Sequence, residues 1–152
     1  MRTAPRSSFI YVSFIRTTPE KVWEALTDPK FIRQYWFGST VECSWKKGSP
    51  WKLLGADGGL TDSGEILEID PPRRMVIRWQ NEWKAELKAE GPGRCTIVLE
   101  PAGHAVKLTI THEIDRPNSK LITAVSGGWP AVISNLKSLL ESGAPVITEW
   151  AH

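Results

Sequence analysis

The first 35 residues change from a strand pattern to a helix pattern. Residues 9–16 (FIYVSFIR) are rich in β-branched and aromatic side chains, which is typical of a β-strand. Thr18-Pro19 then supplies a capping hydroxyl and a proline suited to the first helical position, and Asp28-Pro29 repeats the arrangement. These residues predict one strand followed by two short helices, the second reaching about residue 35.

Between residues 41 and 114 short apolar runs are separated by glycine, proline, aspartate and serine, which are the residues of turns. We expect strands near residues 43–46, 50–55, 63–69, 74–80, 83–89, 94–100 and 105–114. Because only short turns join them, neighbouring strands should pair antiparallel. Apolar and polar positions alternate in the last strand, which places Ile110 and His112 on its buried face.

From residue 119 to residue 142 apolar side chains recur at helical spacing, which predicts a long amphipathic helix. Asn118 or Ser119 can cap its start, and Gly143 suits its end. Since proline inside a helix removes a hydrogen bond and costs about 3 kcal/mol, Gly127-Gly128-Trp129-Pro130 predicts a kink or a break. Such a point is either a close backbone approach, a bending lid, or a packing kink around a curved sheet.

This order of elements predicts an α+β fold. A lone amphipathic helix buries its apolar stripe against the apolar face of the sheet. A strongly curved sheet around one helix leaves space between the two unless large side chains fill it. We expect a single domain over residues 1–152, with a core from about residue 9 to residue 143 and a tail over 144–152.

Composition argues against several classes of protein. The net charge is +2 and basic residues are scattered, so no nucleic-acid partner is expected. No run of 18 apolar residues predicts a membrane span, and the first 16 residues lack the pattern of a signal peptide. Cys43 and Cys95 have neither metal-ligand nor redox spacing. We therefore expect no metal, no cofactor and a reduced, cytoplasmic protein.

Four motifs, in order, resemble those of one known family. They are residues 18–29 (TPEKVWEALTDP), residues 64–74 (GEILEIDPPRR) with 77–79 (IRW), residues 108–112 (LTITH), and residues 127–130 (GGWP) ahead of 136–141 (LKSLLE). They are similar to homologues of the activator of the heat-shock-protein-90 ATPase, within the START-like, birch-pollen-allergen-like superfamily. The resemblance covers about residues 9 to 143.

The resemblance implies a helix-grip fold, in which a curved antiparallel sheet grips a long C-terminal helix and two short helices follow the first strand. Our strand count exceeds the family's usual number by one, so either 43–46 and 50–55 pair as a short hairpin or 83–89 is irregular. Superfamily members bind lipids, sterols, polyketides and other apolar ligands in a central cavity, and some are cyclases or dehydratases. The eponymous protein stimulates a chaperone's ATPase through two domains, of which this chain resembles one; that activity would imply a role in the stress response.

His112 is the first candidate site residue. Its place on the apolar face directs its ring into the interior, where it can hydrogen-bond a ligand or exchange a proton near neutral pH. The plainer alternative is a buried histidine whose nitrogens are satisfied by neighbouring groups.

Eight tryptophans are many for 152 residues, and the aromatic residues form the second candidate set. Their rings can supply flat apolar walls with a hydrogen-bonding edge, or they can simply fill the core, as we expect for Trp23 and Trp45. The predicted ligand-binding residues are Tyr35, Trp36, Phe37, Met75, Ile77, Trp79, Ile110, His112, Val125, Trp129 and Ile133.

The favoured interpretation is a protein that binds a small apolar molecule, lipid-like or aromatic, between the sheet and the C-terminal helix. An enzyme of the cyclase, dehydratase or hydrolase type is one alternative, although no acid–base pair or nucleophile motif is present and no catalytic residue is assigned. A module that contacts a chaperone is the other. Residues 144–150 (APVITEW) are a candidate surface for a homodimer.

Overall fold

The computed structural model describes residues 6–149, and its elements largely follow the predicted order. Strand β1 (Ser7–Ile15) precedes the helices α1 (Pro19–Thr27) and α2 (Pro29–Tyr35). The strands that follow are β2 (Thr40–Cys43), β3 (Pro50–Leu54), β4 (Leu60–Asp70), β5 (Arg74–Asn81), β6 (Gly93–Ala102) and β7 (Ala105–Ile114). A four-residue helix, α3 (Ala85–Lys88), separates β5 from β6, and α4 (Lys120–Ser142) is the long C-terminal helix.

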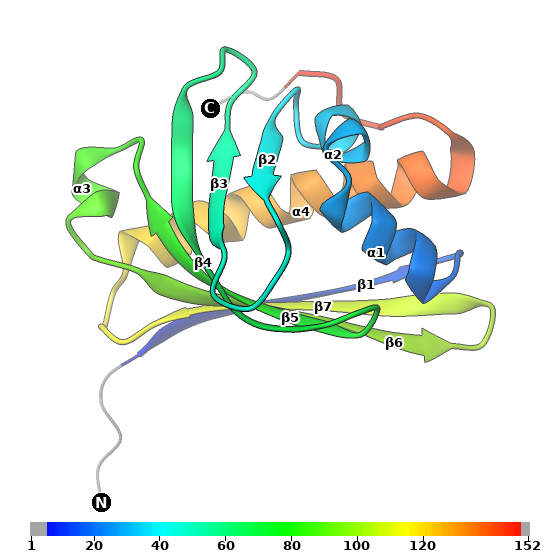
Figure 1. Cartoon of the computed structure of the whole chain (residues 1–152), viewed down its shortest axis with the longest axis horizontal. Helices are drawn as coiled ribbons and strands as arrows, with labels where there is room; N and C mark the ends of the chain where they lie inside the picture. The colour runs from blue at the N-terminus through cyan, green and yellow to red at the C-terminus, as the bar shows by residue number, and fades with distance from the viewer. Residues whose placement is uncertain (1–5, 150–152) are drawn as a thin grey trace, which may run out of the picture.

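Over residues 6–149 the strands form one seven-stranded antiparallel sheet of order β1-β7-β6-β5-β4-β3-β2. The sheet curves so that β2, β3 and β4 rise beside α4, which crosses the concave face, while α1 and α2 lie over the other part of that face (Figure 1). Strands β1 and β2 are the two edges of the sheet. The predicted α+β helix-grip fold is confirmed.

The predicted capping residues begin the helices. The Thr18 hydroxyl accepts a hydrogen bond from the Lys21 N–H, and the Asp28 carboxylate accepts one from the Lys30 N–H. Ser119 rather than Asn118 caps α4 by accepting from the Ile122 N–H. Gly143 ends α4 at a φ of +89°, a left-handed conformation that glycine adopts without a Cβ clash.

The alternation in β7 sets the inner face of the sheet. Its even-numbered residues from Val106 to Ile114 are buried, and its odd-numbered residues are partly exposed. Ile110 and His112 are both fully buried. The same pattern continues through β6 and β5, whose inward side chains pack against the apolar stripe of α4 to form the core.

Two strand predictions differ from the structure. The strand expected at 83–89 is wrong, because the Asn81 carboxamide accepts from the N–H groups of Trp83 and Lys84 and turns the chain into α3. The residues of α3 (AELK) are good helix formers. The strand expected at 43–46 is β2, which pairs with β3 as a hairpin. It lies earlier, at 40–43, because the chain leaves the extended conformation at Trp45, where φ is +55°.

A kink or a break was expected at residues 127–130, and the break is wrong. Helix α4 runs unbroken from Lys120 to Ser142 with Pro130 inside it. A Cβ added at Gly127 or Gly128 would meet no atom within 4 Å, so these glycines do not permit a close backbone approach. Burial of the stripe on both sides of Pro130 holds the helix together despite the missing N–H.

Candidate functional site

An aromatic cluster fills the space between the inner face of the sheet and α4. Trp51 of β3 and Trp79 of β5 come from the sheet, Trp129 from α4, and Trp36 from the residue that follows α2. The ring of Trp79 is central: its centroid lies 4.4 Å from that of Trp51, 5.6 Å from that of Trp129 and 6.3 Å from that of Trp36. Trp36 also meets Trp129 edge to face at 5.3 Å.

His112 joins this cluster from β7. The Trp129 Nε1–H donates to His112 Nδ1 at 3.2 Å, so the proton of the neutral imidazole resides on Nε2. The Nε2 atom is buried and has no hydrogen-bond partner among residues 6–149. Burial lowers the pKa of His112 to about 4, so the ring is neutral at physiological pH. The site therefore holds an N–H donor in apolar surroundings, with the Trp79 ring 5.2 Å away, edge to face.

Asp62 of β4 is a second polar group, which the sequence analysis missed. Its carboxylate accepts from Trp79 Nε1 at 2.9 Å and from Asn81 Nδ2 at 3.4 Å. Burial raises the pKa of Asp62 to about 6, against the opposing effect of those hydrogen bonds. The signal was present in the sequence, because Asp62 shares strand parity with the buried Ile66.

The remaining space inside the cluster is small. A cavity of about 20 Å³ lies among the rings, enough for one water molecule. The predicted residues that line it are Tyr35, Trp36, Met75, Ile77, Trp79, Trp129 and Ile133; the others are Leu26, Val41, Trp45, Trp51, Ile97 and Val132. The open space expected between sheet and helix is therefore largely occupied by tryptophan side chains in this conformation.

Four predicted residues lie outside that lining. Ile110 and His112 are buried in β7 without lining the cavity, although the His112 ring contacts Trp79 and Trp129, which do line it. Val125, which is half-buried, also packs against a smaller cluster under the first turns of α4. Phe37 lines a different, outer pocket, and Trp45, expected only to fill the core, borders the cavity.

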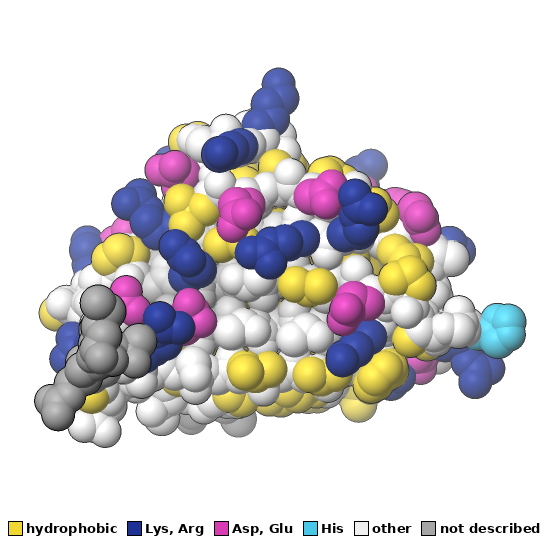
Figure 2. All heavy atoms as spheres, turned by 90° about the horizontal axis from the view of Figure 1, so that it is seen from below, with side chains coloured by type: hydrophobic (Ala, Val, Ile, Leu, Met, Phe, Trp, Pro, Cys, Tyr) yellow, Lys and Arg dark blue, Asp and Glu magenta, His cyan; other side chains and the backbone are white. Residues whose placement is uncertain are grey.

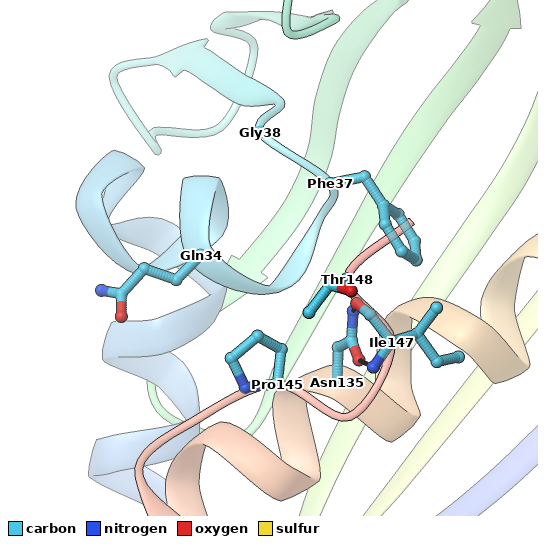
Figure 3. Close-up of a pocket in the computed structure, with 7 residues that line it drawn as sticks. All are labelled: Gln34, Phe37, Gly38, Asn135, Pro145, Ile147 and Thr148. Atoms are coloured by element: carbon cyan, nitrogen blue, oxygen red, sulfur yellow. Dashed lines mark hydrogen bonds between the residues drawn. The ribbon is translucent and has the colours of Figure 1, made fainter. Parts of the chain in front are cut away.

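The outer pocket has a volume of about 430 Å³ and opens at the end of α2 (Figure 3). Its lining residues are Gln34, Phe37, Gly38, Asn135, Pro145, Ile147 and Thr148. Gly38 has a φ of +78°, and a Cβ there would lie 3.0 Å from the Ala56 Cβ, so the turn beside Trp36 requires glycine. The pocket is thus lined by Phe37 and Gly38, the two residues that follow Trp36 in the chain.

Asn135 of α4 connects this pocket to the interior. Its Oδ1 accepts from the N–H groups of Val146 and Ile147, and its Nδ2 donates to the carbonyls of Ile147 and Tyr35. The side chain, only 1% exposed, therefore fastens the segment after α4 and the end of α2 to the same helix turn. Sequence reasoning missed it because an asparagine within a helical stripe does not show which backbone groups it meets.

The structure identifies no metal site and no membrane-crossing helix within the described ranges. No group of three or more histidine, cysteine, aspartate and glutamate side chains in residues 6–149 is arranged to hold a metal ion. No helix in that range combines the length and apolarity needed to cross a membrane. Cys43 and Cys95 are both free thiols.

Comparison with known proteins gives a consistent picture. Residues 16–141 match the model of the family described as Activator of Hsp90 ATPase homolog 1-like protein. No curated protein matches the chain by sequence. A dimeric Aha1 from Colwellia psychrerythraea superposes with a TM-score of 0.73 at 17% identity, over 90% of this chain and 98% of the other.

Two further solved structures show the same fold. An HSP90 activator from Plasmodium falciparum has a TM-score of 0.71 at 23% identity, covering 88% of this chain and 95% of its own. A protein from Cytophaga hutchinsonii has a TM-score of 0.70 at 28% identity, covering 89% of this chain and 94% of its own.

Proposed function

Because this chain belongs to the family of Activator of Hsp90 ATPase homolog 1-like proteins, we propose that it is a binding module for a small, flat, apolar molecule held between the sheet and α4. The unpaired Nε2–H of His112 carries the proposal. Buried donors in proteins almost always have an acceptor, and leaving one without costs about 1–3 kcal/mol. An oxygen or ring nitrogen of a bound ligand would supply the acceptor.

Tryptophan rings determine the class of ligand. Flat aromatic molecules pack against the faces and edges of indole rings. Each ring pair adds about 0.5–1.5 kcal/mol of binding free energy to that gained from burying apolar area. Besides the tryptophans the lining contains Tyr35 and aliphatic or thioether side chains such as Met75 and Ile77. An aromatic compound with one hydrogen-bond acceptor fits this chemistry better than a flexible fatty acid.

Binding requires Trp36 to move, since a cavity of about 20 Å³ does not admit a ring system. Trp36 is half-buried, whereas Trp51, Trp79 and Trp129 are each at most 4% exposed. It is followed by Phe37 at a φ of +50° and Gly38 at +78°, so it ends a helix on an irregular turn. The outer pocket beside that turn offers a path inward when the indole swings out.

The arrangement favours binding over catalysis. General acid–base chemistry needs two polar groups that reach one bound atom. The carboxylate of Asp62 is already engaged with Trp79 and Asn81, and His112 Nδ1 is engaged with Trp129. A cyclase, dehydratase or hydrolase would need these bonds to be released first.

The proposal is tested by titrating the full chain with 2-acetylnaphthalene while recording intrinsic tryptophan fluorescence. We expect a saturable change with micromolar affinity, because the indoles of Trp36, Trp79 and Trp129 change their surroundings. Trp83, which is 57% exposed and does not line the cavity, provides a matched control: Trp83→Phe should leave the titration unchanged. No saturable response to flat aromatic ligands would refute the proposal.

The filled interior favours a second candidate, a module that acts through its surface on a chaperone and takes part in the stress response. One protein of the same fold is an HSP90 activator. Adding this chain to a purified Hsp90 and measuring ATP hydrolysis tests the idea. A rate increase that survives Trp36→Ala would assign the activity to the surface, and an unchanged rate would exclude it.

A further inference from the structure

Strand β1 is an edge of the sheet, and its outer edge is only partly covered. The Phe14 carbonyl and the Arg16 N–H bond to side chains of α4 and not to β7, so they point away from the sheet. Because backbone groups alternate in direction along a strand, the N–H and C=O groups of residues 8, 10 and 12 also point outward. Among residues 6–149, the outward groups of Ser8, Ile10 and Val12 have no hydrogen-bond partner. A row of unpaired backbone groups is a template for another strand.

Two side chains of α4 close one end of this edge. Lys137 Nζ donates to the Phe14 carbonyl at 2.5 Å, and the Glu141 carboxylate accepts from the Arg16 N–H at 2.7 Å. Lys137 and Glu141 also pair with each other at 2.8 Å. Strand addition is therefore blocked beyond Val12, and the segment left open, Ser8–Val12, is centred on Ile10.

The open segment carries apolar side chains on the outer face of the sheet. Ile10 is 62% exposed, Val12 43% and Phe14 52%. Figure 2 views this outer face and shows hydrophobic side chains gathered along one margin of it. Long apolar edge strands are usually protected by charges, prolines or bulges, and Ser8–Val12 has none of these.

We propose that a second copy of this chain pairs with this edge, β1 against β1, in an antiparallel two-fold arrangement with Ile10 on the axis. In this register Ile10 faces Ile10, and Ser8 faces Val12 of the second copy. Each facing pair exchanges two backbone hydrogen bonds, because all three residues present their groups outward. The two sheets become one continuous sheet, and both α4 helices remain on its concave side.

The ends of the segment are complementary in this register. Arg6 of one copy lies opposite Phe14 of the other, which allows a cation–π contact. The Arg6 guanidinium is held in place by Glu113 at 3.7 Å and Asp115 at 3.6 Å.

Sedimentation equilibrium of the full chain tests the association. We expect a mass of twice 17.0 kDa for the wild type. Ile10→Pro should give the monomer mass, because it removes only an outward N–H and leaves the pairing with β7 intact. Val146→Lys, at a 67% exposed apolar position in the C-terminal segment, is the control and should remain dimeric. A monomeric wild type, or a dimer that Val146→Lys dissociates and Ile10→Pro does not, would overturn the proposal.

Oxidative cross-linking tests the register in a Cys43→Ser background, where Cys95 is buried. Ile10→Cys should form a disulfide with its own copy, because directly opposed residues lie within bonding distance. Val12→Cys alone should not, since the two positions would be about 13 Å apart along the strands. An equal mixture of Ser8→Cys and Val12→Cys chains should cross-link. Self-linkage at residue 12 rather than 10 would contradict this register.

Discussion

The indole N–H of Trp129 donates to His112 Nδ1 across 3.2 Å and thereby ties the middle of α4 to the inner face of β7. This bond fixes the tautomer of a fully buried imidazole and directs its remaining proton away from α4's indole.

Trp129→Phe should destabilise the protein by about 2 kcal/mol or more, because it leaves His112 Nδ1 buried without a donor while keeping most of the ring. Urea unfolding at pH 7 measures the change. Trp83→Phe, the same substitution at an exposed position, should alter the free energy of unfolding by less than about 0.5 kcal/mol. Equal effects of the two substitutions would show that the Trp129–His112 bond adds nothing.

Asp62→Asn should stabilise the protein at neutral pH. The pKa of Asp62 is about 6 in the folded state against 3.8 ordinarily, so folding favours its protonated form. The stabilisation of the folded protein by this group is complete below pH 3.8 and is lost as pH rises through 6. Above pH 6 the buried carboxylate costs about 1–3 kcal/mol. The asparagine amide oxygen still accepts from Trp79 Nε1. Unfolding at pH 7.5 and pH 4 checks this: the gain should be large at pH 7.5 and small at pH 4, and a loss at pH 7.5 would contradict it.

His112 should make the Asp62→Asn variant acid-sensitive. Its pKa falls from 6.5 to about 4 on folding, so folding favours the neutral imidazole. The stabilisation of the folded protein by this group is complete above pH 6.5 and is lost as pH falls toward 4, which lowers the free energy of unfolding by about 3 kcal/mol. In the wild type, Asp62 offsets this trend over the same range. Adding His112→Gln to Asp62→Asn should flatten the pH profile between 6.5 and 4, and an unchanged slope would show that the imidazole does not titrate as described.

Asn135→Ala should release the segment after α4. The Val146 and Ile147 N–H groups lose their acceptor, so their amide hydrogen exchange should accelerate by at least tenfold, with the core of α4 unaffected. Gln34→Ala is the control, because Gln34 lines the same pocket but bonds to the Lys30 carbonyl. Protection of Val146 and Ile147 that persists in Asn135→Ala would mean that other contacts hold this segment.

Trp36→Ala should bind flat aromatic molecules more tightly than the wild type, since the space occupied by the indole is already open. We expect an affinity gain of about tenfold for 2-acetylnaphthalene by calorimetry. The gain should be specific to this position, because Trp51→Ala removes a fully packed ring from the sheet and mainly destabilises the core. Weaker binding by Trp36→Ala would indicate that the indole is a wall of the occupied site and not its closure.

Local patterns predicted most of the fold, whereas the site depends on contacts between distant segments. Thr18, Asp28 and Gly143 act through neighbours in the sequence, so their roles were readable. The alternation in β7 likewise placed His112 correctly. The helix break predicted at Pro130 does not occur, because burial of the apolar stripe on both sides of Pro130 outweighs the unfavourable local propensity of proline. The strand predicted at residues 83–89 is absent, because the Asn81 side chain accepts from the N–H groups of Trp83 and Lys84 and turns the chain into α3. Spacing along the sequence does not reveal that contact.

Partners across the sheet could not be read from spacing. That Asp62 lies beside Trp79 depends on the register between β4 and β5, which includes a bulge near residue 67. How far the tryptophans fill the interior depends on side-chain volumes and rotamers, which alternation does not encode. The homodimer surface expected at 144–150 lies only partly within the described residues, because Trp150 is outside them, and Asn135 already engages the backbone of residues 146 and 147.

The most direct test of the account compares two ligands of nearly equal shape, 2-acetylnaphthalene and 2-ethylnaphthalene, by calorimetry with the wild type and with His112→Phe. Only the ketone offers an acceptor to the Nε2–H of His112. The account predicts that the wild type binds the ketone about tenfold more tightly, corresponding to 1.4 kcal/mol, and that folded His112→Phe loses this preference. Equal affinity of the wild type for both ligands, or a preference that persists in His112→Phe, would contradict it.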